Sequence, residues 1–377
     1  MTLAGHGDIV SARAMFGDNR AMKDWLGRQK AQFLVNFDKV TWTQSEKYGE
    51  TVTTCDPTLP FHRVSDVVVS GRPALVCRLP KLPYDLFEDC IPFDRRGTTK
   101  RFLRQGVSFD TATSLDSAVC LSDWWFENYW HWLFEKLPKV VLAESTGFNG
   151  IYLVPPHPFC AESLRLMGIP QDRIRIHNGE TLRIGELLIS PRIPGPDMLH
   201  HLDILAQVRS RLMQSIVPNG SGRRFYLSRS KGKLNGRRVV NEDALQTLTH
   251  QYGFEDYVGE GKSLAQQIAD FAACEAALGP HGAAFANMLF APQGTLTVEL
   301  FSPLYVFHHI EPAIRLSGLR HYQVVADADL RRPAPRGLRK KLKQALNGKP
   351  LYPHGDGVVA ELDVIESILL RELRQRD

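Results

Sequence analysis

The sequence lacks several features that would place it in a specialised class of protein. A zinc ribbon or a thioredoxin-like site needs two cysteines separated by two residues. The six cysteines of this sequence lie far apart, so neither kind of site is expected. No stretch reaches the roughly 20 apolar residues that span a bilayer. A secretory signal has a basic start followed by an apolar run, and the first residues of this sequence do not show that pattern. We therefore expect reduced thiols, a cytoplasmic setting, no metal and no cofactor.

The composition is that of an ordinary globular protein, and the charge is unevenly placed. The chain has 377 residues, of which 43% are hydrophobic and 23% charged, which suits two domains or one large one and excludes disorder and collagen-like repeats. The net charge is +5, yet residues 331–349 alone hold eight basic side chains and no acid. Because this segment carries +8, the remaining 358 residues carry −3. We expect no nucleic-acid partner.

Strand-like and helix-like patterns alternate through the second half, which predicts a doubly wound parallel sheet. In such sheets, ligands bind at the carboxyl ends of the strands. The expected strands are 225–229, 254–258, 275–279, 295–301 and 321–325, and the expected helices are 241–253, 263–274, 282–291 and 305–318.

The first half is less regular, with strand-like runs around a helix that begins near Trp124. These runs cover 64–69, 74–79, 115–121, 151–155 and 182–190, and a second helix is expected near 199–216. We expect an α/β domain over 1–196 with an irregular start of about 60 residues, a Rossmann-like domain over 197–330, and a basic segment with a final helix over 331–377. The Pro-rich run 191–196 is the expected linker.

A first candidate site lies in the aromatic segment 122–138. Asn128, His131 and Glu135 share one face of a helix, and a carboxylate beside an imidazole orients it and stabilises its charged form. Flat aromatic faces beside polar groups suit stacking against sugar rings. The alternative is a buried amphipathic helix whose aromatics belong to the core and whose histidine is structural.

A second candidate site lies in 225–242. Arg229 stands at the end of an expected strand, and Lys233, Arg237 and Arg238 follow on a Gly-containing loop. Cations at a strand end indicate an anionic ligand such as a diphosphate. The alternative is a solvated basic loop.

A third candidate site lies in 278–300. The chain passes through His281 and Gly282 into a helix of small residues, so we expect the backbone amides of 281–283 to face an anion. Glu299, an acid in an apolar strand, is placed to accept the hydroxyls of a ribose. The alternatives are close helix packing for the glycine and an edge position for the glutamate.

Taken together, the three segments resemble glycosyltransferase family 61, whose bacterial members are often labelled capsular polysaccharide biosynthesis proteins. The resemblance implies a GT-B architecture, in which two Rossmann-like domains face across a cleft, and inverting transfer from a nucleotide sugar without a required metal. The matching runs are NYWHWLFEKLP at 128–138, YLSR at 226–229, RR at 237–238, NE at 241–242, and GPHGAAFANMLFAPQG at 279–294 followed by VEL.

The resemblance also implies roles for individual residues. The donor diphosphate falls to Arg229, His281 and Gly282, and the nucleoside to Glu299. It also places His131 and Glu135 on the acceptor side. To these roles we add our own candidates: Lys233, Arg237, Arg238, Ala283 and Asn287 for the donor, and Asn128, Trp132 and Asp123 for the acceptor.

The expected reaction is a single displacement in which His131, oriented by Glu135, takes the proton of the acceptor hydroxyl. Glu135 or Asp123 is an alternative base. The expected acceptor is a glycan or a lipid-linked saccharide of surface polysaccharide biosynthesis. The rival hypothesis is a non-catalytic nucleotide-binding module with a basic tail that binds a membrane or a polyanion.

The basic segment itself is typical of a short helix that lies on anionic lipid. In GLRKKLKQAL (337–346), leucines recur at helical spacing between the cations. We expect peripheral association with the inner face of the membrane. A solvated linker that leads to the final helix at 358–373 is the alternative.

Overall fold

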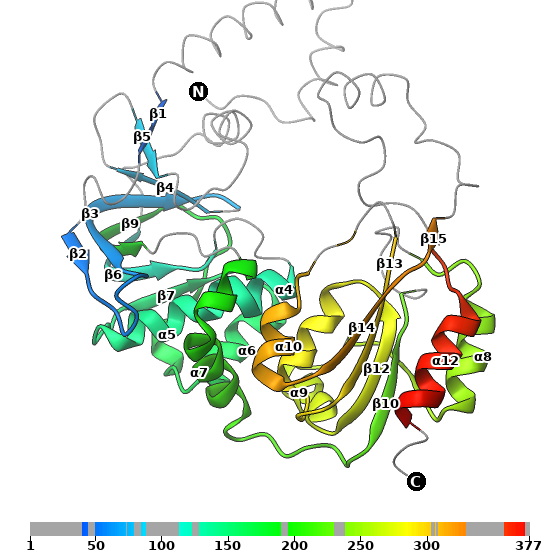
Figure 1. Cartoon of the computed structure of the whole chain (residues 1–377). Coiled ribbons are helices and arrows are strands. Elements are labelled where there is room, and N and C mark those ends of the chain that lie inside the picture. Colours follow the sequence, from blue (N-terminus) through cyan, green and yellow to red (C-terminus); the bar gives the residue numbers. More distant parts are fainter. Residues whose placement is uncertain are drawn as a thin grey trace, which may run out of the picture. The chain divides into compact units, whose positions relative to one another are not determined.

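The computed structural model describes residues 40–43, 50–72, 74–78, 84–87, 113–122, 128–189, 195–229, 238–302, 306, 308–328 and 358–373. The chain divides into two compact units, Met1–Ile193 and Pro194–Asp377 (Figure 1), and each is described by itself. The expectations for Asp123, Lys233, Arg237 and the basic segment 331–349 lie outside the described residues.

The first unit is built on one mixed sheet, ordered β1-β5-β4-β3-β9-β6-β7-β8 with β2 paired to β3. Strands β9, β6, β7 and β8 pair in parallel, whereas β3 pairs antiparallel with both β4 and β9. The sheet therefore departs from the wholly parallel pattern of a Rossmann-like domain. The strands are β1 Val40–Thr43, β2 Glu50–Val52, β3 Phe61–Ser70, β4 Leu75–Arg78, β5 Tyr84–Phe87, β6 Thr113–Cys120, β7 Ile151–Val154, β8 Ile174–Ile176 and β9 Leu182–Ile189.

Apolar side chains of β3, β4, β6 and β9 form a core cluster of this unit, branched in β3 and β9 and smaller in β6, which contributes Ala118 and Cys120. Every second residue of a strand faces the same side of the sheet, so Val67 and Val69 of β3 point toward this cluster together. The helical segments are α4 Tyr129–His131, η3 Trp132–Lys136, α5 Leu137–Ser145, α6 Pro158–Leu166 and η4 Gln171–Arg173.

The second unit carries the expected parallel sheet. Its five strands are all parallel and follow the order β11-β10-β12-β13-β14, which is 2-1-3-4-5 when counted along the chain. The direction of winding reverses between β10 and β12, and ligands of open parallel sheets bind at such a point. The strands are β10 Arg223–Leu227, β11 Glu255–Tyr257, β12 Cys274–Pro280, β13 Leu296–Phe301 and β14 Arg320–Val325.

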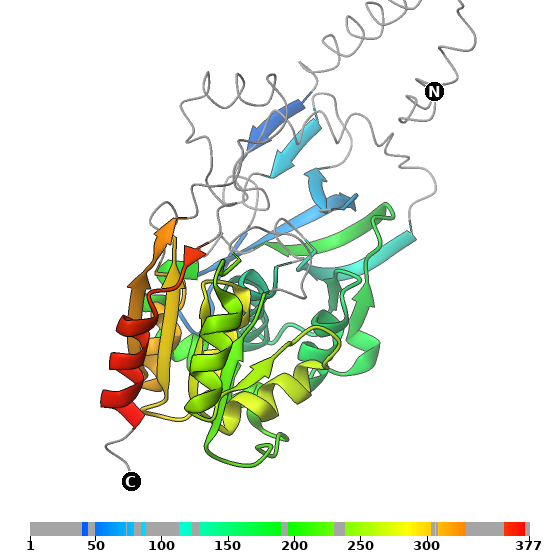
Figure 2. The same cartoon turned by 90° about the vertical axis from the view of Figure 1, so that its right-hand side faces the viewer.

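Helices cover both faces of this sheet (Figures 1 and 2). On one face α8 (Glu242–Gln251) and α12 (Leu362–Leu373) share an apolar core with the strands. The other face carries a packed group of helical segments: α7 Leu202–Met213, α9 Leu264–Ala272, η6 Ala283–Phe290 and α10 Glu311–Ser317, with η5 Gly195–His200 ahead of α7.

Local sequence signals explain where these helices begin and end. Ser263 and Gln266 form a reciprocal capping box at the start of α9. α10 ends at Gly318, whose φ of 59° lies in the left-handed region that favours glycine. The segment after Gly282 is a 3-10 helix instead of an α-helix, a form that is uncommon at this length.

The C-terminal segment closes the second unit. β15 (Asp327–Ala328) pairs antiparallel with β16 (Val358–Val359). The side chain of Asn241 donates to the carbonyl of Ala360 at 2.9 Å and accepts from its amide at 2.8 Å. Ile365 and Leu369 of α12 are fully buried. The segment is therefore part of the core of this unit.

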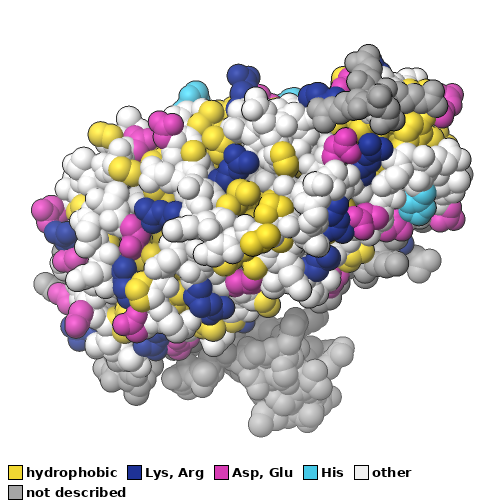
Figure 3. Space-filling model, turned by 90° about the horizontal axis from the view of Figure 1, so that it is seen from below, with side chains coloured by type: hydrophobic (Ala, Val, Ile, Leu, Met, Phe, Trp, Pro, Cys, Tyr) yellow, Lys and Arg dark blue, Asp and Glu magenta, His cyan; other side chains and the backbone are white. Residues whose placement is uncertain are grey.

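Charges of both signs are interspersed on the face drawn in Figure 3, with hydrophobic side chains between them. Among the described residues, no helix has both the length and the apolar character needed to cross a bilayer.

Candidate functional site

His131 and Glu135 meet in the first unit, as their spacing predicts. Nδ1 of His131 lies 2.9 Å from Oε2 of Glu135. The imidazole is 20% exposed and the carboxylate 7% exposed, so water reaches the histidine but hardly reaches the acid. This geometry orients the ring and leaves it accessible, which suits a proton acceptor.

A π-helix carries this pair, and the sequence analysis did not anticipate it. In η3 the amide of Leu137 donates to the carbonyl of Trp132, five residues back. Pro138 follows at once, and a proline within a helix lacks an amide and presses on the carbonyl four residues earlier. The wider turn accommodates that pressure. Such single π-turns occur frequently at functional sites.

Two residues expected on the acceptor side have structural contacts instead. The side chain of Asn128 accepts from the amide of Trp130 at 2.9 Å and so caps α4. Trp132 is fully buried, and its indole Nε1 donates to Ser163 at 2.9 Å. We expected Trp132 on the acceptor side, but its ring is fully buried and belongs to the core.

In the second unit, Arg229 meets Gly282 at the point where the sheet reverses. Arg229 follows the end of β10, and its Nη1 donates to the carbonyl of His281 at 3.0 Å. A Cβ on Gly282 would lie 2.2 Å from that Nη1, closer than any real contact. Only glycine allows the guanidinium and this backbone to lie so close together.

The amide of His281 does not face a ligand, although we expected the amides of 281–283 to do so. It donates to the carbonyl of Leu300 at 2.8 Å and so extends the pairing of β12 with β13. Gly282 and Ala283 are half-buried and open η6, and the first amides of a helix have no partner within it. The expectation is therefore narrowed to the amides after His281.

Glu299 lies in β13 between two histidines. Its Oε1 is 2.5 Å from Nδ1 of His281, and its Oε2 is 3.3 Å from Nε2 of His321. The carboxylate side chain is 1% exposed. Burial acts to raise the pKa of Glu299, but the contacts with His281 and His321 outweigh it, and the pKa lies below its ordinary value.

His321 is a site residue that the sequence analysis missed. In the register of β13 and β14, Glu299 pairs with Gln323, so His321 lies two residues earlier on the same face. The sequence does show a histidine near the start of the strand that follows β13. Its contact with Glu299 can be inferred only when the register between the two strands is known.

The remaining donor-side residues hold the surrounding backbone. Asn287 is buried and donates to Gln267 of α9 at 3.1 Å, and the carbonyl of Arg238 accepts from the amide of Val358 at 2.8 Å. Glu242 accepts from Ser228 at 2.8 Å and from Tyr226 at 3.1 Å, which fixes the end of β10 next to Arg229.

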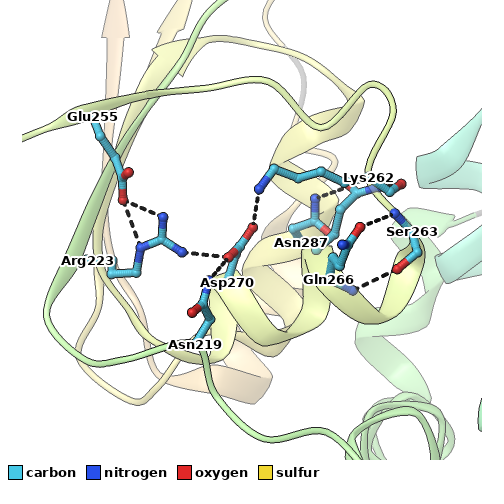
Figure 4. A network of polar contacts seen from close by, with 9 residues as sticks. Asn219, Arg223, Glu255, Lys262, Ser263, Gln266, Asp270 and Asn287 are labelled. Carbon is cyan, nitrogen blue, oxygen red and sulfur yellow. Dashed lines mark hydrogen bonds and ion pairs between the residues drawn. The ribbon is translucent and has the colours of Figure 1, made fainter.

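A second polar network lies at the start of β10 (Figure 4). Asp270 accepts from Arg223 at 2.5 Å, Asn219 at 2.7 Å and Lys262 at 2.8 Å, and its side chain is 2% exposed. Burial acts to raise the pKa of Asp270, but these three partners outweigh it and lower the pKa. Because Arg223 begins β10 and Arg229 follows its end, the network supports the fold and lies apart from the candidate site.

The arrangement in the second unit suits an anionic ligand. A guanidinium, an imidazole and the amides at the start of η6 gather at the carboxyl ends of β10 and β12. Within the described part of the chain, no cluster of three or more His, Cys, Asp and Glu side chains could hold a metal ion.

Fold and geometry together define an α/β protein whose parallel sheet has a candidate anion site at its reversal point. Residues 129–298 match the model of the family described as Glycosyltransferase 61. This match runs from α4 into the first half of β13, including His131, Arg229 and Gly282, and it supports that family and a glycosyltransferase activity. No curated protein matches the chain in sequence.

Proposed function

We propose that this protein is an inverting glycosyltransferase that moves a sugar from a nucleotide-sugar donor to a glycan or a lipid-linked saccharide in surface polysaccharide biosynthesis. The supporting observation is the contact of the Arg229 guanidinium with the backbone at Gly282, inside the segment that matches the family. The proposal includes a GT-B architecture and a cytoplasmic enzyme that associates peripherally with anionic membrane.

In this proposal the second unit binds the donor. The diphosphate gains negative charge as it leaves the anomeric carbon, and Arg229 with the amides at the start of η6 stabilises that charge. Preorganised donors of this kind contribute about 3–4 kcal/mol each. No metal is then required to neutralise the leaving group.

The first unit supplies the base. The acceptor hydroxyl attacks the anomeric carbon opposite the leaving diphosphate and loses its proton to His131, which Glu135 orients. One bond forms and one breaks in a single displacement, so the sugar is transferred with inversion. The partly exposed position of His131 supports this role.

The test is a panel of nucleotide sugars incubated with and without acceptor saccharides, in which the released nucleotide is measured. We expect release that depends on acceptor, persists in EDTA and yields an inverted anomeric centre by NMR. Arg229→Ala should lower kcat/KM by about 100- to 1000-fold. Arg315→Ala, which removes a guanidinium that is 66% exposed and paired with Glu311, is the matched control and should stay within about two-fold.

Two results would count against the proposal. Binding of nucleotide without turnover for any acceptor would favour a non-catalytic nucleotide-binding module. Activity that vanishes in EDTA and returns with manganese would exclude the metal-independent mechanism.

A further inference from the structure

Three side chains from neighbouring strands form a buried chain of polar contacts beside the candidate donor site. His281 directly follows β12, Glu299 lies in β13 and His321 in β14. The two oxygens of Glu299 face one imidazole each, at 2.5 Å and 3.3 Å. The three side chains are 5%, 1% and 10% exposed, respectively. One carboxylate is therefore shared by two histidines away from water.

This geometry determines which nitrogen of His281 faces the carboxylate. An ionised carboxylate only accepts hydrogen bonds, so Nδ1 of His281 has to carry a proton. The second nitrogen, Nε2, then points away from Glu299. The ring is held by stacking on Phe301, with centroids 4.7 Å apart, and lies 5.6 Å from the ring of His309.

The charge of Glu299 adds a second constraint. A buried carboxylate is costly unless hydrogen bonds and a nearby positive charge compensate it. Both of its contacts among the described residues are imidazoles, so the compensating charge falls on His281 or His321. A charged His281 carries a proton on Nε2 as well, and such a group makes a strong charge-assisted hydrogen bond to a phosphate.

We propose that Glu299 and His321 are positioning residues that hold His281 as an imidazolium whose Nε2 donates to the diphosphate of the donor. The inference rests on the proposed function, because it places the diphosphate at Arg229 and Gly282. It gives His321 a role in orienting Glu299. It also assigns Glu299 to hold His281, in place of the ribose contact that we expected from the sequence.

The first experiment measures binding of inorganic pyrophosphate by calorimetry at pH 7. We expect Glu299→Gln to weaken binding by about 10- to 100-fold and His321→Gln by about 3- to 10-fold. Thr297→Val is the matched control, since Thr297 is fully buried on the same strand and the change removes only a hydroxyl. It should stay within about two-fold. Equal affinity of Glu299→Gln and the unmodified protein would overturn the proposal.

The second experiment needs no ligand. Nitrogen NMR of 15N-histidine-labelled protein reports the tautomer and charge of each ring, and His281→Gln identifies the signal of His281. We expect protons on both Nδ1 and Nε2 of His281 in the unmodified protein at pH 7, and the loss of one of them in Glu299→Gln. A neutral ring of either tautomer in the unmodified protein, or a doubly protonated ring that Glu299→Gln leaves unchanged, would refute the assignment. If Glu299→Gln does not fold, the same NMR measurement on His321→Gln tests the proposal instead.

The two experiments separate this inference from the proposed function. Unchanged histidine spectra in Glu299→Gln, together with normal sugar transfer by the unmodified protein, would refute only the positioning roles. If the histidine spectra are as expected but the protein binds neither pyrophosphate nor nucleoside diphosphates, the proposed donor site is refuted. The proposed contact of His281 with the diphosphate is then refuted as well.

Discussion

His131 and Glu135 meet within one helical segment, whereas two strands of a parallel sheet bring His281 and Glu299 together. The first pair is four residues apart in the chain and the second is eighteen apart. The imidazole of the first pair is 20% exposed, and that of the second is 5% exposed. The same two chemical groups therefore occur once near water and once in the core.

The difference separates two uses of the same pair. A partly exposed imidazole beside a carboxylate exchanges its proton readily, which suits a base. A buried imidazole beside a shared carboxylate is held in one orientation, which suits a fixed contact to an anion. In the proposed enzyme, the local pair moves a proton and the long-range pair holds charge.

The largest effect is expected from the local pair. His131→Ala removes the proposed base and should lower kcat by about 10²- to 10⁴-fold with little change in donor affinity, because the donor site lies in the other unit. Steady-state kinetics with saturating donor measures this. His157→Gln, a histidine of the same unit that packs on Phe159, is the control. Near-normal turnover of His131→Ala would transfer the role to Glu135 or Asp123.

A smaller loss, seen in donor binding, is expected at Gly282. Gly282→Ala places a methyl group at the guanidinium of Arg229 and should weaken nucleotide binding by about 100-fold, the worth of one charge-assisted contact with some strain. Calorimetry with the cognate nucleoside diphosphate measures it. Arg315→Ala is again the control, because its exposed guanidinium pairs with Glu311 on α10. Equal binding by Gly282→Ala would show that Arg229 can move away without loss.

The smallest effect on activity is expected at Asp270, a buried carboxylate outside both pairs. Asp270→Asn leaves Arg223 and Lys262 without their shared anion and should lower the free energy of unfolding by about 2–3 kcal/mol. The folded fraction should bind donor normally. Urea unfolding and donor titration measure the two quantities. A large loss of donor binding in folded Asp270→Asn protein would show that the network reaches the site.

The pH dependence of stability has a definite sign here. The pKa values of Asp270 and Glu299 are both lower in the folded protein than their ordinary values. Their contribution to stability is therefore full above about pH 5, where both groups are ionised even in the unfolded chain, and is lost as the pH falls through the lowered values. Asp270→Asn should therefore make the free energy of unfolding fall less between neutral and acidic pH. The decrease that remains in this variant includes the contribution of Glu299.

Much of the fold could be predicted from the sequence because its signals are local. The capping box at Ser263, the glycine after α10 and the alternation of apolar runs mark the elements of the second unit. The contact of His131 with Glu135 follows from the helical repeat alone. The π-turn was missed, although Pro138 in an otherwise helical run is a local reason for it.

What remained hidden depends on register between strands. Glu299 appears in the sequence as an isolated acid, and only the pairing of β12, β13 and β14 shows that two histidines enclose it. The burial of Trp132 is likewise a matter of packing, since an aromatic run reads the same on a core face and on a sugar-binding face.

The C-terminal segment has a consequence for how the protein forms in the cell. Helix α12 supplies Ile365, Leu369 and Leu373 to the core that covers one face of the second sheet. Because the N-terminal part of a chain leaves the ribosome first, this sheet keeps an apolar face uncovered until the chain has been translated through Leu373. The first unit can fold during synthesis, whereas the second completes its folding only after translation has passed its last helix.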